Sequence, residues 1–413
     1  MYETKLACVT CRKTFPLEVR YSCADCGGIL EVLYDYEPLQ RETAAEDLIP
    51  EPGLGLWRYK HLLPVSQEAA MLTLHEGGTP LIHGRNLAGK IGAGELYLKD
   101  ETRNPSGAFK DRPMTVGISK ARELGCRAVT TASSGNGAAS LAVYAAKAGL
   151  PCFIFVPEGT PIGKVAHAVT AGAQVIKVRG DYSNSYRTAK QAAADYSWMN
   201  VTTTFLNPYT FEGDKTVAYE LYRQLGRKVP DWILIPTGAG PLVYGIFKGL
   251  TELKRFGLTA RMPRLVAVQS EGCQPIAAAF NGGQERVKAW DEVKTVASAI
   301  ADPLRGYERD GELVLRVLRE SRGLALAVSD AEMLQDVRLL AATEGVYDEP
   351  AAAAAVSALR RLLASGGIGK ADQVVCLVTG HGLKDPISAV KDVQVPVIDP
   401  DPGQLAKLIG RGA

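Results

Sequence analysis

The middle of the chain is constrained most by a regular alternation of buried strand patterns with helical patterns. Short apolar segments at residues 128–132, 152–156 and 174–178 have the length and the Val, Ile and Phe content of buried strands. Helical patterns at 138–148 and 183–197 follow the first and the last of them. Strands that alternate with helices form parallel sheets, because a parallel pair needs a crossover connection. The sequence therefore predicts an α/β fold with a doubly wound, mainly parallel open sheet.

Polar or glycine-rich turns follow several predicted strands. Ser133-Ser134-Gly135-Asn136-Gly137 and Thr237-Gly238-Ala239-Gly240-Pro241-Leu242 each open a predicted helix, and Thr379-Gly380-His381-Gly382-Leu383-Lys384-Asp385 follows a third strand. Backbone N–H groups at such turns suit a phosphate or a carboxylate. The second turn is not a dinucleotide fingerprint, because Val243 stands at the sixth position of the G-x-G-x-x-G pattern that begins at Gly238, and no ribose-binding acid follows as expected. Each turn alone is also compatible with an ordinary connection between a strand and a helix that binds no ligand.

A single lysine loop precedes these turns, at Asn104-Pro105-Ser106-Gly107-Ala108-Phe109-Lys110-Asp111-Arg112. Small residues leave room for a flat ligand, and Phe109 can help to desolvate the Lys110 ammonium. A lowered pKa is what a lysine needs to form a Schiff base with a carbonyl group. The alternative is a surface lysine in a turn, but the three later turns favour a binding site.

Four of the eight cysteines lie in the first thirty residues. Cys8-x-x-Cys11 and Cys23-x-x-Cys26 have the spacing of two zinc knuckles, and 17–21 and 30–34 alternate like the strands of a hairpin. The pattern predicts a structural zinc ribbon, since four thiolates leave no open position for catalysis. Free thiols are the alternative. The segment 37–55 is rich in proline and acidic residues, and we predict a linker there.

Composition excludes several classes of function. The 413 residues carry a net charge of +2, with 46% hydrophobic and 22% charged residues, as in ordinary globular proteins. Nothing in this charge favours nucleic acid or a membrane surface as a partner. The N-terminus lacks a signal-peptide core, and no apolar run reaches the roughly 20 residues of a membrane span. We expect a cytoplasmic protein.

The lysine loop and the Thr379–Asp385 motif together resemble threonine synthase and related pyridoxal-phosphate enzymes of the tryptophan-synthase-β fold. The resemblance extends from the cysteine segment to Asp385. It implies fold type II, with two doubly wound, mainly parallel sheets, and a homodimer. The implied domains are a zinc-ribbon-like segment at 1–45, a large domain at 46–110 and 205–413, and a small domain at 111–204.

The resemblance also implies roles for individual residues. Lys110, with Phe109 beside it, would bind pyridoxal 5'-phosphate as a Schiff base and move the Cα proton. Asn136 would bond the ring oxygen, and Thr379 would face the pyridine nitrogen as a neutral hydroxyl. The cofactor phosphate would lie against Gly238, Ala239, Gly240, Pro241 and Leu242. The substrate carboxylate would bind at Ser133, Ser134 and Gly135, next to Asn136.

The sequence departs from the family pattern where the substrate phosphate is expected. Thr210 stands where the family has an arginine, and Phe205 where it has a serine. Ala239 replaces an asparagine, and Pro241 stands where the family often has glycine and removes an N–H donor. Losing the arginine would cost charge-assisted hydrogen bonds of roughly 1.5–3 kcal/mol each.

These departures leave two enzymatic interpretations and one other. In the first, the chain would be a threonine synthase that converts O-phosphohomoserine and water into L-threonine and phosphate, with anion ligands from elsewhere, such as Arg305 and Arg309. Alternatively it acts on an unphosphorylated substrate, as a hydroxy-amino acid dehydratase or β-replacement enzyme. The third possibility is a binding protein with a degenerate cofactor domain, which the intact Lys110, Asn136 and Thr379 disfavour.

Overall fold

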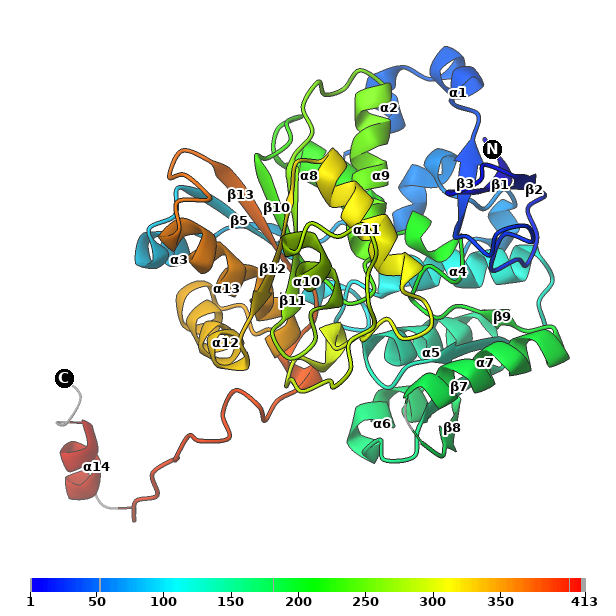
Figure 1. Cartoon of the computed structure of the whole chain (residues 1–413). Coiled ribbons are helices and arrows are strands. Elements are labelled where there is room, and N and C mark those ends of the chain that lie inside the picture. The colour runs from blue at the N-terminus through cyan, green and yellow to red at the C-terminus, as the bar shows by residue number, and fades with distance from the viewer. Residues whose placement is uncertain (1, 52, 181, 401, 410–413) are drawn as a thin grey trace.

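The computed structural model describes residues 2–51, 53–180, 182–400 and 402–409. Figure 1 shows two separate sheets with helices around them, and a small sheet at the N-terminus. The predicted α/β class with two mainly parallel open sheets is confirmed. The boundaries of the three expected domains stay a prediction.

The larger sheet has six strands in the order β12-β11-β10-β13-β5-β4. All neighbours in it are parallel except β4, which runs antiparallel to β5. Its strands are β4 (Leu81–His83), β5 (Glu95–Asp100), β10 (Trp232–Pro236), β11 (Arg264–Ser270), β12 (Leu324–Val328) and β13 (Gln373–Val378).

Helices cover both faces of this sheet because successive side chains of a strand point to opposite sides. Ile233 and Ile235 of β10 belong to one apolar core, with side chains of α8, α9 and α11. Trp232 and Leu234 belong to a second core, with the alanine-rich α13 and with α12. These helices are α8 (Thr216–Gln224), α9 (Pro241–Arg255), α11 (Arg309–Glu320), α12 (Asp330–Glu344) and α13 (Pro350–Ala364).

The smaller sheet has four parallel strands in the order β8-β7-β6-β9. Val129 and Ile154 pack against α4 and α5, whereas Phe155 on the other face packs against α7. The elements are β6 (Val129–Ala132), β7 (Cys152–Pro157), β8 (Gln174–Val178), β9 (Met199–Asn200), α4 (Asp111–Glu123), α5 (Asn136–Ala148), α6 (Ile162–Thr170) and α7 (Tyr182–Tyr196).

The N-terminal ribbon is a three-stranded antiparallel sheet of β1 (Glu3–Cys8), β2 (Thr14–Phe15) and β3 (Leu30–Tyr34). The strand predicted at 30–34 is present. The strand predicted at 17–21 is wrong, because β3 pairs with β1 and this segment turns away. There the Tyr21 hydroxyl accepts a hydrogen bond from Asn200 N in β9, at 2.7 Å.

The linker predicted at 37–55 is also wrong, since α1 (Tyr36–Glu42) and α2 (Ala45–Leu48) occupy most of its first half. The Asp35 carboxylate caps α1 by accepting from Glu37 N, and Leu39, Leu48 and Ile49 are buried in the larger core. Proline and acidic residues therefore begin helices here, as they often do at first turns.

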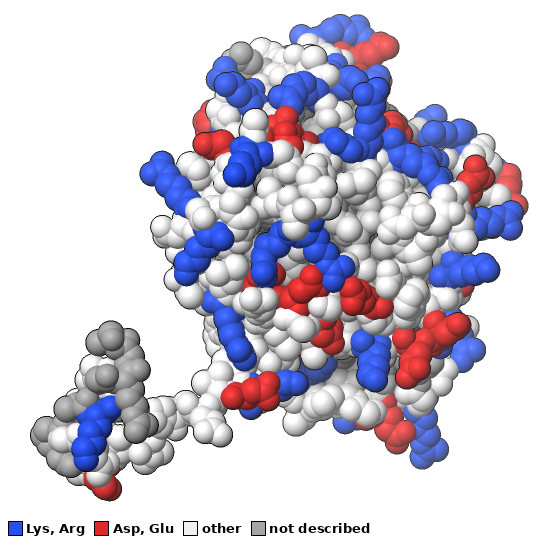
Figure 2. All heavy atoms as spheres, turned by 60° about the vertical axis from the view of Figure 1, so that its left-hand side comes forward, with Lys and Arg blue, Asp and Glu red and all other residues white. Residues whose placement is uncertain are grey.

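The remaining helices are α3 (Arg85–Ile91), α10 (Pro275–Asn281) and α14 (Pro402–Ile409). Figures 1 and 2 show α14 on an arm that stands away from the body. Basic and acidic side chains both occur over the face shown in Figure 2. Among the described residues, no helix is long and apolar enough to cross a membrane.

Candidate active site

A cavity of about 1090 Å³ lies where the carboxyl ends of β6, β10 and β13 meet the loop before α4. Ligands of open α/β sheets bind at such strand ends. The predicted site residues that line this cavity are Phe109, Lys110, Ser133, Ser134, Gly135, Asn136, Gly238, Ala239, Gly240, Pro241, Leu242 and Thr379. The structure thus brings together segments that are far apart in the sequence.

The lysine loop is held by the segment that follows β13. Phe109 N donates to the Thr379 carbonyl at 3.0 Å, and His381 N donates to the Gly107 carbonyl at 2.9 Å. Gly107 has φ +80°, which glycine adopts without strain. The loop and the Thr379 segment therefore form one short antiparallel pairing, with Lys110 just before α4.

Lys110 lies in an environment that favours its neutral form. Its Nζ is 4.6 Å from the centroid of the Phe109 ring. Burial lowers the pKa of Lys110 to about 8, although the negative charges of Asp214 and Asp302 act to raise it. A lysine with this pKa is partly unprotonated near neutral pH, which nucleophilic attack on an aldehyde requires.

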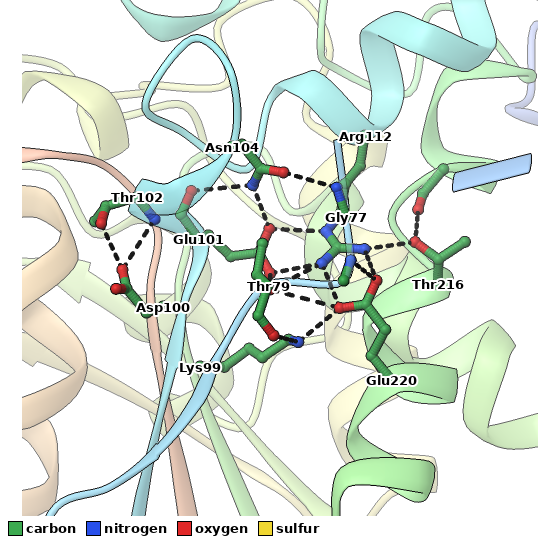
Figure 3. Close-up of polar contacts among 12 residues, drawn as sticks. Gly77, Thr79, Lys99, Asp100, Glu101, Thr102, Asn104, Arg112, Thr216 and Glu220 are labelled. Carbon is green, nitrogen blue, oxygen red and sulfur yellow. Dashed lines mark hydrogen bonds and ion pairs between the residues drawn. The ribbon is translucent and has the colours of Figure 1, made fainter. Parts of the chain in front are cut away.

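A network of buried charges lies under the lysine loop (Figure 3). Arg112 donates to Glu101 and to Glu220 with several bonds of 2.7–2.8 Å, and Lys99 donates to Glu220 at 2.6 Å. Asn104 in the loop joins it by donating to Glu101 at 2.8 Å. Since these charges come from β5, α4 and α8 and from the residues between them, the network fixes the base of the loop.

The turn between β10 and α9 offers backbone donors to the cavity. Gly240 has φ +103°, and a Cβ there would lie 2.1 Å from Val314 Cγ2, so only glycine fits. Pro241 is the first residue of α9. The first N–H groups of a helix have no partner inside the helix, so a proline there loses little, and those of the next residues remain for an anion.

Asn136 begins α5, and its side chain meets a carboxyl group that the sequence reasoning missed. Asn136 Nδ2 donates to Glu349 Oε1 at 2.7 Å. Burial raises the pKa of Glu349 to about 7, and the bond from Asn136 opposes that shift. A Cβ at Gly380 would lie 2.2 Å from Glu349 Oε1, so this corner has no spare room.

The cavity also carries a cationic wall, whose charge comes from Lys164 and Lys384, with His167 beside them. Lys384 is half-buried, and its Cε lies 3.5 Å from the place of a Cβ at Gly107. Burial lowers the pKa of Lys384, while Glu349 acts to raise it. Burial and the charge of Lys384 lower the pKa of His167, so these two side chains are electrostatically coupled.

Phe205 and Thr210 do not line the cavity. The Phe205 ring packs in the core against Phe211 and Tyr244, with centroids 5.5 and 5.6 Å away. The Thr210 hydroxyl donates to the Asn207 carbonyl at 3.0 Å, and its methyl group lies against Gly117. The structure therefore does not bring these two predicted substrate ligands to Lys110.

The two arginines suggested as substitute anion ligands differ in position. Arg305 lines the cavity, but its side chain is exposed and donates to the Asp291 carbonyl at 2.9 Å. Arg309 is not among the lining residues and donates to the Cys26 carbonyl of the ribbon at 2.6 Å.

The residues present fit pyridoxal phosphate. A lysine with a lowered pKa, a glycine turn at a helix N-terminus and Thr379, which carries a neutral hydroxyl, all line one cavity of suitable size. Besides Glu349, the sequence reasoning missed Asp214, Asp302 and the lysines of the cationic wall. The only local signal at Glu349 was that of a helix start, because Glu-Pro precedes the alanine-rich helical pattern.

Comparisons with known proteins agree with this geometry. Residues 72–380 match the family described as pyridoxal-phosphate dependent enzyme. The chain is 38% identical to threonine synthase of Methanocaldococcus jannaschii, covering 97% of this chain and 98% of that protein. It is 40% identical to threonine synthase of Methanosarcina acetivorans, covering 96% of both. A fungal L-serine ammonia-lyase from Rhizomucor miehei shares the fold, with a TM-score of 0.62 and 24% identity over 73% of this chain and 93% of that one.

Proposed function

We propose that this chain, which belongs to the pyridoxal-phosphate-dependent enzymes and among them to the threonine synthases, converts O-phosphohomoserine and water into L-threonine and phosphate. Its cofactor is pyridoxal 5'-phosphate. When bound, this cofactor supplies an electron sink for negative charge that develops at the substrate Cα.

The observation that carries the choice of substrate is the cationic wall, in which Lys164 and Lys384 supply the charge and His167 lies beside them. A phosphate dianion gains charge-assisted hydrogen bonds from such a wall, whereas an unphosphorylated hydroxy-amino acid has no group to place there. The wall replaces the arginine that the family pattern led us to expect at Thr210. We therefore assign the substrate phosphate to Lys384 and Lys164, with His167 beside them.

The substrate carboxylate would lie at Ser133, Ser134 and Gly135, at the N-terminus of α5. N–H groups at a helix start favour an anion there. With one anion at α5 and the other at the cationic wall, the substrate is held at both ends. The substrate Cα would then lie between them, in the cavity that Lys110 also lines.

Lys110 would take the proton from Cα, since burial keeps a fraction of its amine neutral. Phe109 shields this amine from water on one side. Thr379 and the turn from Gly238 to Leu242 would hold the cofactor ring and phosphate. Asn136 would contact the ring oxygen, with Glu349 fixing the orientation of its amide.

The two other interpretations are less well supported. If the enzyme were a dehydratase or β-replacement enzyme for unphosphorylated amino acids, Lys164 and Lys384 would have no substrate anion to bind in the cavity. A binding protein with a dead site leaves the lowered pKa of Lys110 unexplained.

An absorbance titration tests the proposal. The purified holoenzyme is titrated with O-phosphohomoserine, L-threonine, L-serine and O-phosphoserine, and phosphate, threonine and keto acid are measured. Phosphate release with an equal amount of threonine is expected only from O-phosphohomoserine. Keto acid from L-threonine or L-serine, without reaction of O-phosphohomoserine, contradicts the proposal.

Substitutions then test the cationic wall itself. Lys384→Ala and Lys164→Ala should each raise KM for O-phosphohomoserine by about 10–100-fold, as expected for a charge-assisted hydrogen bond of 1.5–3 kcal/mol. Lys147→Ala is the matched control, because Lys147 is an exposed lysine of α5 that does not line the cavity. An unchanged KM in the first two variants would mean that the substrate phosphate does not bind at Lys384 and Lys164.

We also propose a cytoplasmic homodimer, with a ribbon at 1–45, a large domain at 46–110 and 205–413 and a small domain at 111–204. The family resemblance supports each of these points. Light scattering of the eluting protein measures the assembly, and limited proteolysis measures the domain boundaries.

A further inference from the structure

We propose that Cys8, Cys11, Cys23 and Cys26 bind one Zn²⁺ as four thiolates, and that this site holds the ribbon against the elements of the six-stranded and the four-stranded sheet. The sequence spacing predicted a knuckle pair. The structure adds the mutual distances of the sulfur atoms, the room around them and the contacts of the ribbon. None of these depends on the reaction at Lys110.

The four sulfur atoms are arranged as a zinc ion requires. All four Sγ atoms lie within 4.8 Å of one another. Cys8 and Cys26 are 3.5 Å apart, as are Cys11 and Cys23, and Cys11 and Cys26 are 3.6 Å apart. Tetrahedral Zn–S bonds of about 2.3 Å place sulfurs about 3.8 Å apart, close to these values. A disulfide needs about 2.05 Å, so the pairs are not bridges.

The backbone around the sulfurs supports thiolates. Thr10 N and Cys11 N lie 3.4 and 3.5 Å from Cys8 Sγ and donate to it. A Cβ at Gly28 would lie 2.7 Å from Cys8 Sγ and 3.1 Å from Cys26 Sγ, and Gly27 has φ +65°. The second knuckle therefore folds around the sulfurs only because glycines follow Cys26.

The chemistry of the donors points to a structural ion. Four soft thiolates select zinc or iron over calcium or magnesium, and a closed tetrahedron leaves no position for a substrate. Since the ribbon is short, its own apolar core of Leu6, Leu30, Val32 and Tyr34 is small. Small domains of this kind commonly need a metal to fold.

The ribbon contacts the surroundings of both sheets. On the side of the four-stranded sheet, Tyr21 bonds to Asn200 of β9 at 2.7 Å. On the side of the six-stranded sheet, the Tyr244 hydroxyl of α9 donates to Glu31 at 2.6 Å. Arg309, the first residue of α11, donates to the Cys26 carbonyl at 2.6 Å. A single hydrogen bond, from Arg309 to Cys26, thus connects the proposed zinc site to α11.

This last contact connects the metal to the active site. The segment just before α11 includes Asp302 and Arg305, which line the cavity. Asp302 is fixed within it by accepting from the Tyr307 hydroxyl at 2.8 Å. Loss of the metal should therefore loosen the start of α11 and this wall of the cavity, while Lys110 and the turn before α9 stay in place.

The first test measures metal in the full-length holoenzyme. Mass spectrometry of the metals should find about one zinc per chain. Titration of thiols with a mercurial reagent should release zinc as the four ribbon cysteines react. Replacement by Co²⁺ should give the red-region absorption bands of a tetrahedral thiolate site, away from the cofactor absorption.

The variant test uses Cys11→Ala with Cys26→Ala, since these are the two most exposed of the four. The double variant should lose its zinc and unfold at a lower temperature, while retaining the borohydride-trapped cofactor at Lys110. Cys126→Ser is the matched control, a half-buried cysteine outside the ribbon, and should keep one zinc. Wild-type protein that holds no zinc after growth with added zinc, holds iron instead, or keeps its zinc in the double variant overturns the proposal. The wild-type measurements decide the matter even where the variant fails to fold.

Discussion

Two groups of buried charged residues lie on either side of the lysine loop, and they are partnered very differently. Below the loop, Arg112 and Lys99 face Glu101 and Glu220, two cations against two carboxylates, each at most 1% exposed. In and around the cavity, Asp214 and Glu349 are also buried, and Lys110 and Asp302 are half-buried, but these four groups lack such a matched arrangement. The first group is fully bonded, and the second is left able to exchange protons.

The pKa values show the difference. Burial alone would raise the pKa of Glu220, but Arg112 and Lys99 outweigh it and hold the pKa well below its usual value. In and next to the cavity, the effect of burial is the larger one: the pKa of Lys110 falls to about 8, and those of Asp214 and Glu349 rise to about 7. Asp214 Oδ1 has no hydrogen-bond partner in the described part of the chain. Charges that are completely paired hold structure, whereas incompletely paired ones are suited to chemistry near neutral pH.

The strongest test of this contrast removes Lys110 in one variant and Lys99 in another, and compares activity with stability. Lys110→Ala should lower kcat by at least about 10³-fold, because the chain loses its base and its attachment for the cofactor. Its thermal unfolding temperature should change little. Intact-protein mass after borohydride treatment should show no added cofactor.

Lys99→Met is the matched comparison. It should trap the cofactor normally and still lower the unfolding temperature, because Glu220 loses its bond from Lys99. If Lys110→Ala proves the less stable of the two, the assignment of structural and chemical roles is wrong.

The next test breaks the paired network directly. Glu220→Gln should reduce the free energy of unfolding by about 3–5 kcal/mol, since it leaves Arg112 and Lys99 buried without full compensation. Urea unfolding of the apoenzyme measures it. Glu37→Gln removes the exposed partner of Arg41 and should cost less than about 1 kcal/mol. Equal effects would show that burial of the network is unimportant.

The sequence predicted the parts of this site that lie next to strand ends. Lys110 and the turns at Ser133 and Gly238 were found because glycine and small polar residues directly follow apolar runs. Their common cavity follows from parallel strands, whose carboxyl ends share an edge. The same reasoning gave the fold class and most strands.

The remaining site residues could not be found in this way. Lys164 and Asp214 carry no local signal, and only tertiary packing brings Lys164 to the cavity and Asp214 close to Lys110. Lys384 lies within the Thr379–Asp385 motif, but that motif does not show that its side chain lines the cavity. Phe205 and Thr210 show the converse, because the positions expected to bind phosphate are filled by core packing. The ribbon strand at 17–21 was wrong because alternation does not reveal which strands pair.

A smaller effect should appear when Asp214 is neutralised. Only the neutral amine of Lys110 condenses with an aldehyde, so recombination of the apoenzyme with pyridoxal phosphate should speed up as pH rises through about 8. The Asp214 charge raises the pKa of Lys110, so Asp214→Asn should move this midpoint to lower pH, by about one unit. Stopped-flow absorbance measures the rates.

Asp195→Asn serves as the control for this shift. Asp195 lies on the exposed side of α7, where its carboxylate accepts from Gln191. Its substitution should leave the midpoint unchanged. A shift to higher pH in Asp214→Asn would mean that the carboxyl does not stabilise the ammonium of Lys110.

The smallest effect concerns Glu349 and has an unusual sign. Its pKa is raised from 4.5 to about 7, so between these values the native state binds a proton that the unfolded state does not. The free energy of unfolding therefore falls as pH rises through this window, by at most about 1.4 kcal/mol per pH unit from this group. Glu349→Gln should remove that slope, so the apoenzyme variant should gain about 2 kcal/mol relative to wild type between pH 5.5 and 7.5.

Glu332 provides the opposite case within the same fold. Hydrogen bonds from Arg361 and Ser329 overcome the effect of burial and lower the pKa of Glu332 to about 2. Its stabilisation is fully present above about pH 4.5 and is lost only as pH falls toward 2. Glu332→Gln should thus destabilise the protein equally at pH 5.5 and 7.5, whereas the effect of Glu349→Gln depends on pH. If the two substitutions changed the free energy of unfolding with the same pH dependence, Glu349 would be ionised in the native state. The carboxyl group in the cavity would then be stabilised as an anion, like those of the paired network beneath it.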